Sequence, residues 1–171
     1  RGVRSATAGP LLGLAVVYVF FALVGPPSFA TGRTLETVAR QTTIVGVAAL
    51  GMTLVIVAGG IDLSAGSVVA LSTVVVAALL EAGRSALLAA IAGVAAGAAC
   101  GLLNGVLVTR LRVVPFIVTL GTLLLVRGAA KGLAHEQKID APLTWLVELL
   151  AALRPERRWL LVPAGVWLLV A

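Results

Sequence analysis

The sequence predicts an all-α fold, a polytopic transmembrane helical bundle with a broken helix near residues 59–67. Hydrophobic residues make up 60% of the 171 residues and charged residues only 12%, whereas soluble domains carry roughly 25% charged residues. A water-soluble chain of this length could not bury so much apolar surface. The apolar residues also form long uncharged runs, and Gly59, Gly60 and Asp62 interrupt one of them.

Each predicted span is an apolar run that ends at a polar or helix-breaking segment. The first run stops at Gly-Pro-Pro, residues 25–27, because proline cannot continue a helix. Polar gaps at 31–41 and 81–85 separate later runs. Since a spanning helix needs about 20 mostly apolar residues, the predicted spans are residues 6–24, 42–58, 64–80, 86–108, 113–134 and a truncated 159–171.

Two polar segments lie between the predicted spans. In segment 31–41, Glu36 and Arg40 stand four residues apart in the order that favours a helix. We expect either a short helix at the membrane interface or a loop there. Segment 134–158 is a polar loop in which apolar residues recur at helical spacing from Trp145 onward. That spacing predicts a short amphipathic helix.

The run 113–126 is short for a complete span. Arg127 interrupts it, and its length suits a re-entrant or buried helix as well as a spanning one. It spans the bilayer if the helix continues to Ala134, with Arg127 and Lys131 extending toward the lipid headgroups. The residues leave both alternatives open.

A ladder of glycines marks the predicted span 86–108. Gly93, Gly97, Gly101 and Gly105 are each four residues apart, so on a helix they form one groove without side chains. Helices in lipid associate through close van der Waals contact, and the groove predicts a helix-packing seam. Asn104 lies beside the groove, where it either only joins two helices by hydrogen bonds or also contacts a solute.

The interruption near residue 59 predicts a helix end followed by a new helix start. Gly59 and Gly60 favour the break, and Asp62 or Ser64 can cap the next helix by accepting its free N–H groups. Broken helices and small polar residues often line transport routes. The candidates for the helix break or such a route are Gly59, Gly60, Asp62, Ser64, Asn104, Thr119 and Thr122.

Several function classes lack their motifs. The sequence has no phosphate-cradling glycine loop with its lysine, no nucleophile elbow and no metal-ligand cluster, and His135 stands alone. We therefore predict no catalytic residue, no metal and no cofactor on this chain. The net charge of +6 is spread over short polar gaps without interleaved aromatic residues, so no nucleic-acid partner is expected. Cys100 is a lone cysteine and is expected to be a small packing residue.

Two blocks carry a resemblance to a known family. "GMTLVIVAGGIDLSAGSVVAL" (51–71) and "GLLNGVLVTRLRVVPFIVTLGTLLLVRG" (101–128) resemble, in content, order and spacing, the permease subunits of ribose-type ABC sugar importers. That group includes permeases for ribose, xylose, arabinose and galactose. Permeases for branched-chain amino acids share the layout, but "GGIDLS" favours the sugar branch.

The resemblance implies a multi-pass protein of the bacterial cell membrane that moves a monosaccharide. It implies a second permease copy in a dimer, a cytoplasmic ATP-binding subunit that hydrolyses ATP, and an extracytoplasmic sugar-binding protein, with membrane lipid around them. The chain begins at Arg1 and ends in an apolar run at Ala171, so we expect roughly the N-terminal half of a permease. Two alternatives stay open: a permease for another small polar solute, such as a branched-chain amino acid or nucleoside, and a non-transporting scaffold subunit.

The implied orientation conflicts with the distribution of positive charge. The family layout puts segment 134–158 outside, whereas lysine and arginine favour the inside. The residues that would lie outside are Arg127, Lys131, Lys138, Arg154, Arg157 and Arg158. A re-entrant 113–126 would resolve the conflict, but we favour the family layout because the last span must lead to the cytoplasmic loop that follows in this family.

Overall fold

The computed structural model describes residues 2–148, and all regular secondary structure within them is helical. The all-α prediction is thus confirmed for this part of the chain. The helices are α1 (Gly2–Val24), α2 (Gly32–Val57), α3 (Ala65–Glu81), α4 (Ala86–Thr109), α5 (Pro115–Leu133) and α6 (Trp145–Glu148). The predicted span 159–171 and the later part of segment 134–158 lie outside the described residues.

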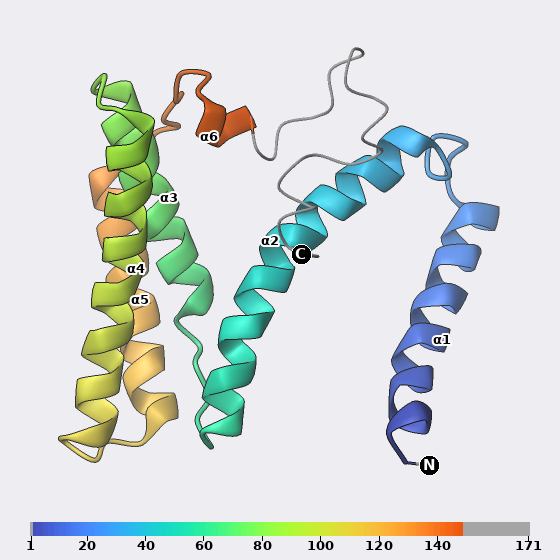
Figure 1. Cartoon of the computed structure of the whole chain (residues 1–171), viewed down its shortest axis with the longest axis horizontal. Coiled ribbons are helices and arrows are strands. Elements are labelled where there is room, and N and C mark those ends of the chain that lie inside the picture. The colour runs from blue at the N-terminus through green and yellow to red at the C-terminus, as the bar shows by residue number, and fades with distance from the viewer. Residues whose placement is uncertain (1, 149–171) are drawn as a thin grey trace.

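Helices α3, α4 and α5 pack side by side into a three-helix cluster (Figure 1). Its buried apolar residues come from all three helices and are Leu80, Ala89, Val118, Val126 and Ala130. Helix α1 stands apart from this cluster, while α2 runs obliquely and meets it near its own C-terminal end. The residues that follow α2 therefore lead directly into the cluster. They form the predicted helix break.

Most of the apolar surface outside the cluster is exposed. Leu23 on α1 and Val57 on α2 are each 80% exposed. Helices α2, α4 and α5 are long and apolar enough to cross a membrane, whereas α3 and the Ala8–Val24 part of α1 are apolar but shorter. Exposed apolar surface of this extent marks contact with lipid or with other protein segments.

The helix α2 begins earlier than the sequence pattern suggests. Segment 31–41 is neither a separate interfacial helix nor a loop, because its residues form the first turns of α2. The start is stabilised at Ser28, whose carbonyl oxygen accepts hydrogen bonds from Thr31 Oγ1 and Thr34 Oγ1, each at 2.8 Å. No proline lies between residues 32 and 57 to interrupt the backbone ladder, so the polar turns and the apolar run form one helix.

Helix α5 continues through both of its cations. Pro115 occupies its first turn, where a missing N–H costs no helical hydrogen bond. The helix then runs past Arg127 and Lys131 to Leu133, as the spanning alternative requires. Its end is closed by two backbone bonds, from His135 N to Gly132 O at 3.1 Å and from Glu136 N to Lys131 O at 3.0 Å.

Candidate functional site

The break after α2 is a glycine-terminated helix end. Gly59 has φ +80°, a conformation that L side chains rarely adopt. Gly59 N donates to Ile56 O and Gly60 N donates to Val55 O, each at 2.9 Å, which is the hydrogen-bond pattern of the Schellman motif. The Gly-Gly pair therefore ends α2 by a defined turn.

Asp62 organises the start of α3. Its Oδ1 accepts two hydrogen bonds from Ser64, one from the backbone N at 2.7 Å and one from Oγ at 2.6 Å. Ser64 is the N-cap residue of α3, and its side chain makes no capping bond of its own. Of the two capping candidates, Asp62 thus holds the helix start, and Ser64 is the residue that it holds.

A chain of side-chain hydrogen bonds leads from Asp62 to α4 and α5. Asn104 on α4 donates from Nδ2 to Ser64 Oγ at 3.0 Å. Thr122 on α5 donates from Oγ1 to Asn104 Oδ1 at 2.6 Å. Ser64, Asn104 and Thr122 are 0%, 8% and 4% exposed, respectively. We call the set Asp62, Ser64, Asn104 and Thr122 the polar chain; each of its donors points toward the carboxylate at its end.

Thr119 attaches the same break to α5 at a second point. Its Oγ1 donates to Ile61 O at 3.1 Å and lies 2.9 Å from Pro115 O, its own helical neighbour. Gly60 also approaches α5, since a Cβ built there would lie 3.9 Å from Pro115 Cβ. The predicted candidates of the break and the two threonines are therefore brought together in one place.

Two cavities flank the polar chain. One of about 350 Å³ lies between the end of α2, α4 and the start of α5, and the other of about 280 Å³ lies between α2, α3 and α4. Both are lined by Asp62, Asn104, Val55 and Gly101. Among the described residues, Asp62 Oδ2 receives no hydrogen bond, so the carboxylate has an acceptor available to whatever occupies these cavities.

The glycine ladder on α4 divides into two halves. A Cβ at Gly93 would lie 2.6 Å from Val76 Cγ2, and one at Gly97 would lie 3.4 Å from Ser72 Oγ, so α3 packs closely there. A Cβ at Gly101 or Gly105 would meet nothing within 4 Å. Within the described residues Gly93 and Gly97 pack against α3, which begins at Ala65 and does not run along the rest of α4; a packing role for Gly101 and Gly105 stays a prediction.

Two contributing residues were not singled out from the sequence. Ser67 is 2% exposed and donates from Oγ to Ser64 O at 2.8 Å, which reinforces the first turn of α3. Ser72 supplies the surface against which Gly97 packs. The spacing of Ser64 and Ser67 by three was the available signal for the first; no local pattern identifies the second. Within residues 2–148 no cluster of metal-binding side chains occurs.

The comparisons with known proteins agree with this site's membrane setting. Residues 34–153, more than two thirds of the chain, match the family described as branched-chain amino acid transport system / permease component. The ribose import permease protein RbsC of Bacillus subtilis (strain 168) is 42% identical over 120 residues, covering 70% of this chain and 37% of that protein. RbsC of Escherichia coli (strain K12) is 37% identical over 158 residues, covering 91% and 49%.

A relative from a third organism matches to a similar extent. The L-arabinose ABC transporter permease protein AraH of Azospirillum brasilense is 40% identical over 121 residues, which cover 69% of this chain and 36% of that protein. The chain thus spans half or less of the length of these curated relatives, and no solved structure matches it. It is a multi-pass membrane protein, and it belongs to the permease component family of the branched-chain amino acid transport system type.

Proposed function

We propose that the chain forms part of the membrane-spanning permease of an ABC importer that moves a monosaccharide across the bacterial cell membrane. The observation that carries this proposal is the set of relatives named for sugars. Permeases named for ribose, fructose, L-arabinose and D-allose each match 68% to 91% of this chain at 37% to 42% identity. These names cover both pentoses and hexoses, so they support the class of solute.

The chemistry around the break supports a neutral, hydroxyl-rich solute. Asp62 offers a carboxylate oxygen and Asn104 an amide to both flanking cavities, and the remaining lining is mostly apolar. Ligand sites commonly combine an apolar lining with a few oriented polar groups, in volumes from about 300 Å³ upward. Sugar hydroxyls both donate and accept hydrogen bonds, which suits this pair of groups. We therefore assign Asp62 and Asn104 to the transport path.

The energy source is assigned to a partner. Neither the sequence motifs nor the described side chains offer a nucleotide site on this chain. We propose that a cytoplasmic ATP-binding subunit hydrolyses ATP, that an extracytoplasmic binding protein delivers the sugar, and that a second permease copy completes the path. No catalytic residue and no cofactor is assigned to this chain.

A second candidate is import of a branched-chain amino acid, which the description of the matching family favours. An amino acid carries a carboxylate that a permease has to compensate when it leaves water. No lysine or arginine lines either cavity beside Asp62 in the described structure. Asp62 suits the ammonium group of an amino acid, but no cation in either described lining pairs with its carboxylate, so the site favours the neutral sugar. A purely structural scaffold role would not explain the two cavities with polar groups beside the break.

The test is an uptake measurement with the complete permease. The permease is co-expressed with its ATP-binding subunit and binding protein, and uptake of labelled ribose, arabinose, fructose and leucine is compared with and without ATP depletion. ATP-dependent uptake of a pentose or hexose is expected. Uptake of leucine without any sugar would reject the sugar proposal in favour of the amino-acid one, and uptake of neither would favour the scaffold.

A further inference from the structure

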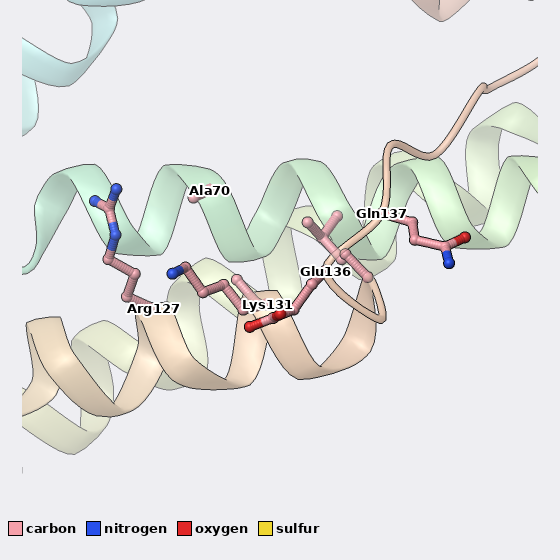
Figure 2. Close-up of a pocket in the computed structure, with 8 residues that line it drawn as sticks. Ala70, Arg127, Lys131, Glu136 and Gln137 are labelled. Carbon is pink, nitrogen blue, oxygen red and sulfur yellow. The ribbon is translucent and has the colours of Figure 1, made fainter.

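A third cavity lies away from the break, between α3 and the later half of α5. It measures about 470 Å³ and is lined by Ala70, Val74, Arg127, Ala130, Lys131, Ala134, Glu136 and Gln137. Figure 2 shows Arg127 and Lys131 extending from α5 toward α3, with Gln137 beyond the end of α5. No residue of the polar chain lines it. This cavity therefore requires an explanation separate from that of the break.

The two cations share one side of α5. Arg127 and Lys131 are four residues apart, and each directly follows a residue buried in the cluster, Val126 or Ala130. Their side chains thus border the α3–α5 contact. The residues that α3 contributes to the lining, Ala70 and Val74, carry no charge.

The charge of this lining is positive and is incompletely balanced. Within residues 2–148 neither Arg127 nor Lys131 forms an ion pair, and the nearby Lys138 pairs with Asp140. Glu136 is the one carboxylate in the lining, and it opposes two cations. Lys131 also lies in the last turn of α5, where a cation stabilises the carbonyl end of a helix. Arg127 lies a full turn earlier, so that effect does not account for it.

We propose that this cavity binds a phosphate group, supplied by the headgroup of an anionic phospholipid. A guanidinium offers paired N–H donors that fit phosphate oxygens, and an ammonium adds a second charge. The Gln137 amide adds a neutral donor at the rim. Because α5 is a candidate span and its cations lie toward one end, they reach headgroup level, where lipid phosphates are abundant. Basic pockets between membrane helices bind lipid headgroups in this way.

The test measures thermal unfolding of the purified full chain in detergent during titration with lipid. Phosphatidylglycerol, phosphatidylcholine and inorganic phosphate are added separately. The parent is compared with Arg127→Gln/Lys131→Gln and with a matched control, Arg110→Gln/Arg112→Gln, which removes two exposed cations after the end of α4. The parent and the control are expected to gain stability from phosphatidylglycerol, whereas the Arg127/Lys131 variant binds it about 30-fold more weakly.

Three outcomes decide the proposal. Equal loss of phosphatidylglycerol binding in both double variants would reveal a general charge effect and overturn the site. Stabilisation of the parent by inorganic phosphate alone, lost with Arg127→Gln/Lys131→Gln, would support the phosphate site but assign it to a soluble anion. If Arg127→Gln/Lys131→Gln does not fold, a third variant still tests the proposal. Glu136→Gln removes the opposing carboxylate and is expected to strengthen binding, so weaker binding in this variant would contradict the proposal.

Discussion

Replacing Asp62 with alanine removes the acceptor that two hydrogen bonds of Ser64 share. Ser64 is completely buried, and its N and Oγ donate to Asp62 Oδ1 at 2.7 and 2.6 Å. A buried donor left without a partner costs about 1–3 kcal/mol. Two such donors give about 2–6 kcal/mol, and water entering the cavities beside residue 62 lowers the cost. We expect Asp62→Ala to reduce the free energy of unfolding by about 2–3 kcal/mol.

The substitution Asp62→Asn separates the acceptor from the charge. The asparagine Oδ1 can accept both bonds from Ser64, and asparagine caps helix starts as well as aspartate does. The bonds lose their charge-assisted strength, which is roughly half of the total. We therefore expect Asp62→Asn to cost about 1 kcal/mol, clearly less than alanine. If Asp62 also contacts the solute, sugar uptake falls in both variants by more than the loss of stability explains.

The assay is equilibrium unfolding in detergent, combined with uptake by the complete importer. Asp140→Ala is the matched control, because this aspartate is exposed and, among the described residues, pairs with Lys138. Its loss should change stability by less than about 0.5 kcal/mol. Equal stabilities of Asp62→Ala and Asp62→Asn would refute the argument from buried donors. Normal stability with lost uptake in Asp62→Asn would instead identify the negative charge as the functional feature.

The remaining predictions concern α4 and α5. Gly93→Ala should destabilise the protein by about 1–3 kcal/mol, since its Cβ would lie 2.6 Å from Val76 Cγ2. Gly101→Ala should be neutral or stabilising by up to about 1 kcal/mol. Thermal unfolding of both variants tests this difference between the two glycines, and equal destabilisation would contradict it. Thr122→Val should cost about 1–3 kcal/mol in the same assay because Asn104 Oδ1 loses its donor, and an unchanged stability would reject that bond. Asn104→Asp should destabilise more than Asn104→Ala at pH 7.

The sequence was sufficient to predict the helix break but not the residues of α4 and α5 that form hydrogen bonds with it. A Gly-Gly pair followed by a carboxylate predicts a helix end and a new start from local backbone preferences alone. The bond between Asn104 and Ser64 joins residues 40 apart in the chain, and the one between Thr122 and Asn104 joins residues 18 apart. Helical periodicity predicts which residues share one face of a helix. It does not predict which residues of a neighbouring helix that face will contact. Residue type alone therefore indicates which residues belong to the polar chain, but not the order in which hydrogen bonds connect them.

The wrong boundary at segment 31–41 and the uneven packing along the glycine ladder have the same origin. Hydropathy separates membrane-spanning from polar segments and so divides segment 31–41 from the apolar run that follows, although both belong to the continuous helix α2. The regular spacing of four glycines on α4 predicts one continuous packing seam. Its use depends on where α3 starts, at Ala65, and on the side chains of Ser72 and Val76 that α3 then presents. Both features depend on how one helix continues or meets another, which composition does not encode.

The direction of the polar chain explains why aspartate is the worse replacement for Asn104. Ser64 Oγ gives its hydrogen to Asp62, so toward α4 it can only accept, and Asn104 Nδ2 supplies the required donor. A carboxylate at residue 104 would place an acceptor against an acceptor and a second negative charge near Asp62. Alanine adds no charge and only leaves the Ser64 and Thr122 hydroxyl groups without their Asn104 partner. Protonation of the new carboxyl group restores an O–H donor toward Ser64 Oγ.

The stability of Asn104→Asp should therefore be greatest at low pH. Because only the protonated carboxyl group donates to Ser64 Oγ, this hydrogen bond stabilises the fold at low pH and is lost as the carboxyl group ionises with rising pH. Unfolding measured from pH 4 to pH 8, each time relative to the parent, should show a growing deficit for Asn104→Asp and a nearly constant one for Asn104→Ala. Parallel curves for the two variants would mean that residue 104 does not need to donate, and that the chain of hydrogen bonds from Thr122 to Asp62 does not run in the direction that the structure gives it.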